Sequence, residues 1–157
     1  YEIYGKGGLP LSEKWSKGVR TLYSYNVRGF PNLWILNGPQ GALTTSFVTQ
    51  LDIAGQHAAH MIQKLKQQGK GALEPKQDSE DAYCDRIYET STQENATSGQ
   101  GQAFFKNCTP GYYNNEGRPG EGPGWFGGNF GGTSQQFFEL LRDWRAQGDL
   151  EGFEVQE

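Results

Sequence analysis

The clearest pattern of apolar positions lies between residues 51 and 65. Apolar side chains recur there at steps of three and four: Leu51, Ala54, Ala58, Met61, Ile62 and Leu65. This spacing places them on one face of an amphipathic helix. Thr44, Thr45 and Ser46 come before the helix and are residue types that cap helix N-termini. Gly69 follows the pattern and marks the expected end of the helix.

A short apolar run precedes this helix. Leu33-Trp34-Ile35-Leu36 is unbroken, and Pro31 favours an extended backbone in front of it. Such a run is typical of a strand that is covered on both faces. Gly38-Pro39 then interrupts the pattern. The sequence therefore predicts a strand over Leu33–Asn37, a tight turn, and a long helix that opens after the hydroxyl residues.

The two ends of the chain also carry predicted elements. Residues 1–4 alternate in the manner of a strand already under way, so we expect the chain to be a piece of a longer protein. Near the other end, Thr133 or Ser134 is predicted to cap a last helix, and Gly148 to end it. The expected inner face of that helix comprises Phe137, Phe138, Leu140, Leu141 and Trp144.

The middle of the chain is more broken. Lys70–Pro75 has the composition of a linker, and Ser79 is predicted to cap a shorter helix. That helix is expected to bury Ala82, Tyr83 and Ile87. The polar stretch that follows predicts an exposed loop, and the glycine-dense, aromatic-rich segment after it is too broken for regular structure.

These patterns divide the chain into three expected parts. Residues 1–69 would hold a strand, a turn and a helix. Residues 70–106 would hold the linker, a surface helix and a polar loop. Residues 107–157 would hold the aromatic, glycine-rich loop and the terminal helix.

Composition narrows the class of protein. A chain of 157 residues is long enough for one modest domain with a buried core. The net charge of −4 argues against a nucleic-acid partner, which needs a concentrated basic surface. No apolar stretch approaches the length of a membrane span, and no secretory leader is recognisable. Cys84 and Cys108 are expected to be reduced thiols in a cytoplasmic protein.

Metal chemistry receives little support from the sequence. His57 and His60 lie three residues apart on the predicted long helix, where they could share a face. Zinc would need at least a third protein ligand, and neither Asp52 nor Asp85 is singled out for that role. We therefore expect no metal site, and histidines that are solvated or that only support other groups.

A glycine motif at residues 122–127 is also uninformative. It spells G-x-G-x-x-G, the fingerprint of dinucleotide-binding folds. That fingerprint requires a strand before it and a helix that opens on its last glycine. Neither pattern is present, so the stretch does not predict phosphate binding.

The segment from residue 33 to 46 is a stronger candidate for ligand binding. A strand, a tight turn and a capped helix would gather free backbone N–H groups at the positive end of a helix dipole. Such a corner suits a phosphate, a carboxylate or the electron-rich edge of a reduced flavin ring. The alternative is a plain strand–helix corner, and local sequence supports the two equally.

Residues 112–115, Tyr-Tyr-Asn-Asn, form the other unusual cluster. Two adjacent rings in a glycine-hinged loop could stack on a flat ligand, while Asn side chains fix its orientation. Alternatively, the rings pin a surface loop to the core. A loop this rich in glycine could also act as a lid over an active site.

Several stretches together resemble the C-terminal portion of a known family. They are "KWSKGVRT", "GFPNLWILNGPQG", "NCTPGYYNNEG" and "FFELLRDWRAQGDLEGFEV". In this order they resemble the Baeyer–Villiger monooxygenases, in the branch with steroid, large-ring ketone and fungal members. The resemblance implies an α/β fold: a fragment of a flavoprotein with two dinucleotide-binding domains. The fragment would supply a strand and a long helix of the FAD-binding layer, with wrapping helices and glycine-rich loops, and its ending resembles the family's last helix and final strand.

The resemblance also assigns roles to residues. Gly38, Pro39, Thr44, Thr45 and Ser46 match positions that approach the isoalloxazine ring of FAD. In addition, the resemblance places Tyr112 and Asn114 on a mobile loop that closes over NADP and substrate.

The implied reaction uses NADPH, FAD and O2 to convert a ketone into an ester or lactone. The remainder of a longer chain would be a necessary partner, because this one lacks the family's dinucleotide fingerprints. Arg20, Arg28 and Arg118 match none of the family's functional positions, so no catalytic residue is expected here. An alternative is a non-catalytic scaffold or small-molecule-binding module. A flavoenzyme that oxygenates nitrogen or sulfur is disfavoured by the "TPGYYNNEG" loop.

Overall fold

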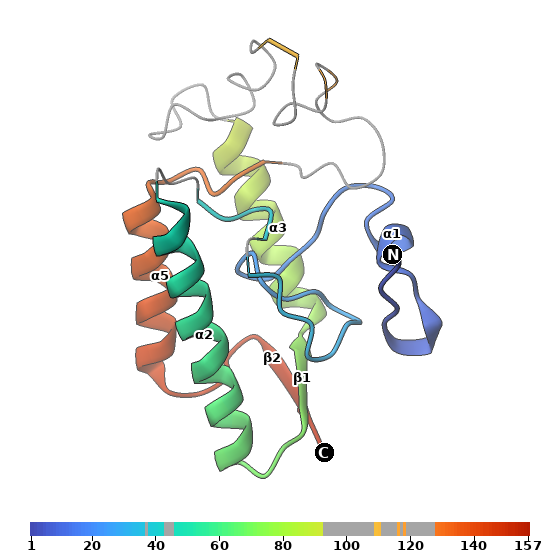
Figure 1. The fold of residues 1–157 in the computed structure, drawn as a ribbon, viewed down its shortest axis with the longest axis vertical. Coiled ribbons are helices and arrows are strands. Elements are labelled where there is room, and N and C mark those ends of the chain that lie inside the picture. The colour runs from blue at the N-terminus through green and yellow to red at the C-terminus, as the bar shows by residue number, and fades with distance from the viewer. Residues whose placement is uncertain (37, 43–45, 93–108, 111–115, 117, 119–127) are drawn as a thin grey trace.

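The computed structural model describes residues 1–36, 38–42, 46–92, 109–110, 116, 118 and 128–157. The described elements, in chain order, are η1 (Lys6–Gly8), α1 (Leu11–Lys14), α2 (Phe47–Gln67), β1 (Ala72–Pro75), α3 (Gln77–Thr92), α5 (Ser134–Gln147) and β2 (Phe153–Gln156) (Figure 1). Among the described residues, no helix combines the length and the apolar character needed to cross a bilayer.

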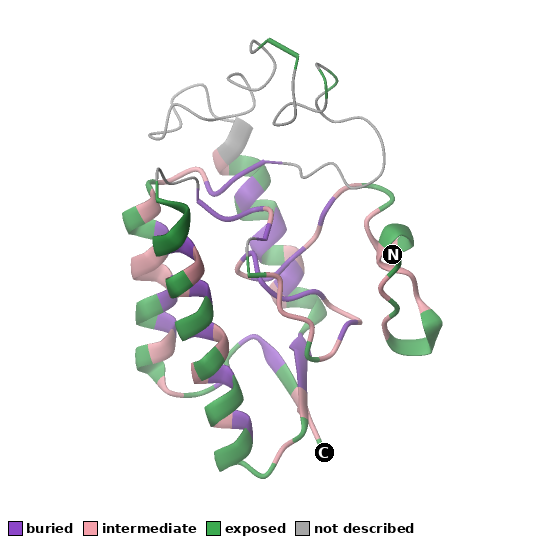
Figure 2. Cartoon of the chain, viewed as in Figure 1, coloured by how far each residue is buried: buried purple, intermediate pink, exposed green. Residues whose placement is uncertain are grey.

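Helices α2 and α5 lie side by side, and their facing sides form much of the core (Figures 1 and 2). The buried apolar side chains of the two helices are Ala54, Met61, Leu65, Phe137, Leu141 and Trp144. Both predicted helices are therefore confirmed, although Ile62 on the expected inner face of α2 is exposed. Thr133 caps α5 in a capping box with Gln136, and Gly148 ends the helix with a left-handed backbone, as predicted.

The predicted linker at Lys70–Pro75 is wrong. Residues 72–75 form strand β1, which pairs antiparallel with β2 so that Leu73 lies opposite Val155. The side chain of Leu73 is buried in the core. The local sequence reads as a linker because a four-residue strand is specified by a partner far along the chain. The final strand implied by the family resemblance is confirmed as β2.

The strand predicted at Leu33–Asn37 is also wrong. Residues 33–36 are irregular, and Leu36 is 45% exposed. Asn32 has a left-handed backbone with φ 57°, and the chain bends there because Leu33 N–H donates to the Phe30 carbonyl. Trp34 packs against the core, but the sheet of the described residues contains only β1 and β2, and this run does not join it.

Two smaller expectations near the ends of elements also fail. Residues 1–4 form no strand, because Tyr4 makes only an isolated bridge to Pro10. Helix α3 begins at Gln77, so Ser79 lies within its first turn and is not its cap. Tyr83 and Ile87 are buried as expected, whereas Ala82 is exposed. The buried core draws on residues from all three predicted parts of the chain.

Two buried carboxylates, those of Glu74 and Glu80, connect the first thirty residues to the rest of the fold through hydrogen bonds and ion pairs. Glu80 on α3 accepts hydrogen bonds from the Arg28 N–H and from Lys14 Nζ, both at 2.7 Å. Glu74 on β1 accepts from the Gly29 N–H at 2.9 Å and also pairs with Lys6. Both carboxylates are almost completely buried. The folded protein would lose stability if either carboxylate lacked its positively charged and N–H partners.

Replacing Glu80 with alanine is expected to lower the free energy of unfolding by about 3 kcal/mol. The change leaves the Arg28 N–H and the largely buried Lys14 ammonium without their acceptor. Urea unfolding of the intact protein measures the loss. The control is Asp143→Ala, which breaks an exposed pair with Arg142 and should cost less than about 1 kcal/mol. Equal losses in the two variants would contradict a structural role for Glu80.

Candidate functional site

The candidate ligand-binding corner consists of the loop at residues 38–42 and the start of α2. Ser46 is the N-cap of α2, since its Oγ accepts a hydrogen bond from the Thr49 N–H at 3.3 Å. Of the three hydroxyl residues predicted as caps, Thr44 and Thr45 lie outside the described residues. The predicted turn at Gly38 and Pro39 is present, but it follows irregular chain and not a strand.

A tight turn at residues 22–25 contacts the 38–42 loop through Ser24. Its middle residues, Tyr23 and Ser24, both have left-handed backbones, with φ of 52° and 73°. The Tyr25 N–H donates to the Leu22 carbonyl at 3.2 Å, which closes the turn. Residues other than glycine adopt this backbone at a cost, so the surrounding structure must hold the turn in place.

Ser24 is fully buried and contacts the loop directly. Its Oγ donates to the Gly38 carbonyl at 2.7 Å. A Cβ added at Gly38 would lie 1.5 Å from the Ser24 carbonyl oxygen. The approach is therefore possible only for glycine, which explains this residue type at position 38.

The carbonyl groups of the loop point into the protein. The Gly38 carbonyl accepts from Ser24, as above, and the Gln40 carbonyl accepts from the Tyr83 hydroxyl at 2.8 Å. The Gly41 carbonyl accepts from the Phe130 N–H at 3.1 Å. Each acceptor is thus satisfied by a buried group from a different part of the fold.

Three N–H groups of the same loop differ in this respect within the part of the chain that the structure describes. Those of Gln40, Gly41 and Ala42 donate to no acceptor in the described part of the chain, although all three residues are buried. Gln40 has a left-handed backbone, with φ 68°, and backbones of this kind can turn successive N–H groups toward one point. Buried donors need acceptors, and the described residues supply none for these three, so the loop is a candidate for contact with an external acceptor.

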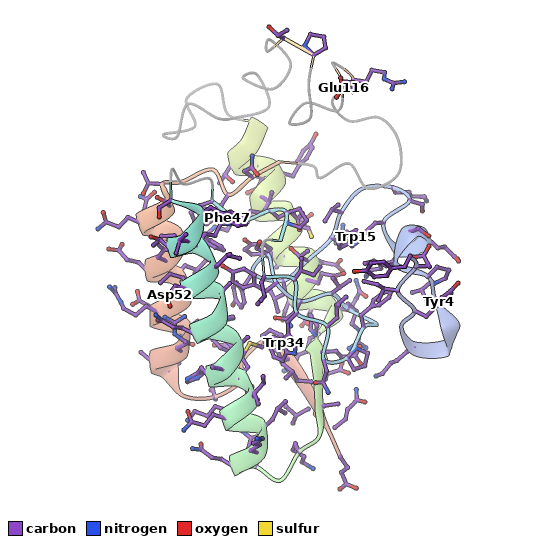
Figure 3. The ribbon with its side chains drawn as sticks, in the orientation of Figure 1. Tyr4, Trp15, Trp34, Phe47, Asp52 and Glu116 are labelled. Atoms are coloured by element: carbon purple, nitrogen blue, oxygen red, sulfur yellow. The ribbon has the colours of Figure 1, made fainter. Side chains whose placement is uncertain are left out.

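The surroundings of the corner reinforce this chemistry. The N-terminus of α2 carries a partial positive charge, which favours a negative or electron-rich group nearby. Leu36, Phe47 and Val48 flank the loop in sequence and are exposed, and Figure 3 shows Phe47 at the start of α2. The corner can therefore hold a phosphate, a carboxylate or the carbonyl edge of a flat ring.

His57 lies in the core, and the expectation of a solvated histidine is wrong for it. Its side chain is completely buried, and neither ring nitrogen has a hydrogen-bond partner. The centroid of its ring lies 4.9 Å from the centroid of the Trp144 ring and 5.7 Å from the centroid of the Tyr25 ring. Burial lowers its pKa to about 3, and the Arg145 charge acts in the same direction. His57 is therefore neutral at ordinary pH.

The other chemically reactive residues form no site. Asp52 and Asp85 are exposed, and no cluster of metal-binding side chains occurs within the described residues. Cys84 is a free, buried thiol whose pKa is raised by burial. Cys108 and the G-x-G-x-x-G stretch lie outside the described residues, as do Tyr112 and Asn114.

Sequence reasoning did not find the residues that shape the loop. Ser24, Gln40 and Tyr83 were not predicted as part of the site, although they hold its backbone. A left-handed backbone at Gln40 leaves no periodic signal, and its contacts lie far apart along the chain. "GPQG", with a polar residue between turn residues, was the only available hint.

The chain is similar to segments of known monooxygenases. It is 36% identical over 155 residues to pentalenolactone D synthase of Streptomyces arenae, covering 99% of this chain and 25% of that protein. A Baeyer–Villiger monooxygenase of Streptomyces coelicolor is 35% identical over 146 residues, covering 92% of this chain and 22% of its own length. The chain thus spans about a quarter of the length of these relatives. No protein-family model matches it.

Solved structures agree with the relatives. A polycyclic ketone monooxygenase from Thermothelomyces thermophila is 26% identical with a TM-score of 0.81, covering 99% of this chain and 24% of that one. An oxidised steroid monooxygenase bound to NADP has the same fold at 22% identity and a TM-score of 0.75, covering 99% of this chain and 26% of that one. The resemblance to Baeyer–Villiger monooxygenases is therefore confirmed.

Proposed function

We propose that this chain, which matches Baeyer–Villiger monooxygenases over nearly its whole length, is the flavin-edge segment of an FAD- and NADPH-dependent monooxygenase. The reaction would insert one oxygen atom of O2 into a ketone and give an ester or lactone. The observation that carries the proposal is the set of N–H groups at Gln40, Gly41 and Ala42, which have no acceptor among the described residues and come shortly before the start of α2.

These residues fit the edge of a flavin ring. The carbonyl-rich rim of the ring accepts hydrogen bonds, and it becomes more electron-rich when the flavin is reduced. Hydrogen bonds to a charged group contribute roughly 1.5–3 kcal/mol each, so several N–H groups at this edge would favour the reduced state. Gly38, Pro39, Thr44, Thr45 and Ser46 would line this contact. FAD, reduced by NADPH, would supply the oxygen chemistry.

The chain itself would bind and orient the ring. The inward carbonyls of the loop keep its acceptors away from the electron-rich rim, which would repel them. Tyr112 and Asn114 would belong to the loop that closes over NADP and substrate. The glycine-rich loops that bind the phosphates of FAD and NADP would belong to the remainder of a longer chain. That remainder is therefore a required partner of this segment under the proposal.

The experiment is purification of the intact protein that contains this segment. We expect a yellow protein with flavin absorbance and NADPH-dependent oxygen uptake that rises when cyclic or polycyclic ketones are added. With labelled O2, the product should carry one labelled oxygen atom. A colourless protein that gains no flavin when FAD is added would overturn the proposal. Oxygenation of amines or sulfides alone would move it to a different reaction class.

A further inference from the structure

Gln40 occupies an unusual position at the centre of the 38–42 loop. It is buried, with 3% of its surface exposed, and it is not glycine although its φ is 68°. A residue with a side chain keeps such a backbone only where other contacts compensate for the strain. The contacts that compensate come from its own side chain.

Both ends of the Gln40 side-chain amide are bonded. Oε1 accepts from the Thr21 N–H at 2.9 Å and from Thr21 Oγ1 at 2.7 Å. Nε2 donates to the Val19 carbonyl at 3.2 Å and lies 3.7 Å from Cys84 Sγ. The side chain therefore contacts the segment just before the 22–25 turn, and its amide is occupied by that segment.

The backbone of Gln40 is held from another side. Its carbonyl accepts the hydroxyl of Tyr83, a buried residue on α3. Side chain and carbonyl together attach the loop to two separate elements, the 19–21 segment and α3. With both fixed, the Gln40–Gly41 peptide plane, which carries the Gly41 N–H group, cannot rotate freely.

We propose that Gln40 is the positioning residue that orients the loop N–H groups toward the flavin edge, an inference that rests on the proposed function. Donors that are already aimed need no reorganisation when charge develops on the ring, so they stabilise it most effectively. Without the side chain, no side-chain hydrogen bonds offset the strain of the left-handed backbone at residue 40. The N–H donors of the loop would then lose their fixed direction.

The test compares flavin midpoint potentials in the intact, FAD-loaded protein. Gln40→Ala should weaken the preference for reduced over oxidised flavin about tenfold, which makes the potential about 30 mV more negative for this two-electron couple. Thr21→Val is a milder second variant. It removes only the hydroxyl donor to Gln40 Oε1 and should shift the potential in the same direction by a smaller amount.

The matched control is Leu150→Ala. Leu150 is a buried core residue between α5 and β2, and its side chain can make none of the hydrogen bonds that hold the loop. It should lower thermal stability and leave the potential unchanged. If Gln40→Ala and Thr21→Val also leave the potential unchanged, Gln40 has only a structural role and the inference is overturned. A wild-type protein that binds no flavin would instead refute the proposed function.

Discussion

Gly38→Ala is expected to lower the free energy of unfolding by more than about 4 kcal/mol. The new methyl group would lie 1.5 Å from the Ser24 carbonyl oxygen and 2.7 Å from its carbonyl carbon. These are backbone atoms of a turn that already has a left-handed conformation at two consecutive residues, so they cannot move aside cheaply. The 38–42 loop should be displaced, and the intact protein should lose its flavin.

Gly55→Ala is the matched control for this experiment. Gly55 lies on α2, and an added methyl group there would meet no atom within 4 Å. The same substitution should therefore stabilise the helix by up to about 1 kcal/mol. Urea unfolding and the flavin absorbance of the purified variants measure both effects. A Gly38→Ala protein that keeps normal stability and colour would show that the loop does not contact Ser24 as described.

The second large effect is a loss of stability in mild acid, caused by His57. Its pKa is about 3 in the folded protein and should return to its ordinary value of 6.5 on unfolding. Because protonation then favours the unfolded chain, the stability is intact above pH 6.5 and falls as the pH drops toward 3. The loss should reach about 2 kcal/mol at pH 5 and about 5 kcal/mol at its acid limit.

His57→Phe should remove most of this dependence between pH 7 and 5. The new ring would lie among Tyr23, Tyr25 and Trp144 and has no nitrogen to protonate. His60 has a lowered pKa as well, but it is only partly buried, so His60→Phe should remove less. Urea unfolding at several pH values measures the slopes. The same slope in wild type and His57→Phe would contradict the prediction.

These pH values separate His57 from the carboxylates that form ion pairs. Burial raises the pKa of Glu74, but its bonds to Lys6 and Gly29 and the charges of Arg28 and Lys6 lower that pKa overall, and the pKa of Asp81 is lowered mainly by its bond to Gln77. For carboxylates with lowered pKa values, the stabilisation is present above the unfolded pKa and is lost only as the pH falls through the lower, folded value. Their contribution therefore disappears below the range in which His57 acts.

The two long amphipathic helices could be predicted because the residues that specify each of them lie close together in the sequence. The three- and four-residue spacing of Met61 and Leu65, and of Phe137 and Leu141, depends on nothing outside each helix. Caps such as Thr133 are equally local, since the bonds they make span three residues. The family resemblance added the final strand, which periodicity alone did not.

The failures share a different cause. Strand β1 forms because β2 pairs with it, and the apolar run at residues 33–36 packs Trp34 against the core without joining a sheet. Burial of His57 follows from its position on the inner face of α2, which a rule for histidines in general overlooks. The shape of the candidate loop depends on Ser24, Gln40 and Tyr83, whose contacts cross up to 44 positions of sequence. Neither spacing nor composition records such contacts.

The antiparallel pair β1–β2 also has a consequence for the order of events during synthesis. Glu74 sits on β1 beside Gly29, and it also accepts a hydrogen bond from Gln156 on β2 at 2.9 Å. Arg28 likewise reaches Glu154 on β2 at 2.9 Å. Arg28 and Glu74 therefore gain some of their partners only when residues 153–156 have left the ribosome. Until then, the attachment of the first thirty residues in a nascent chain would be incomplete.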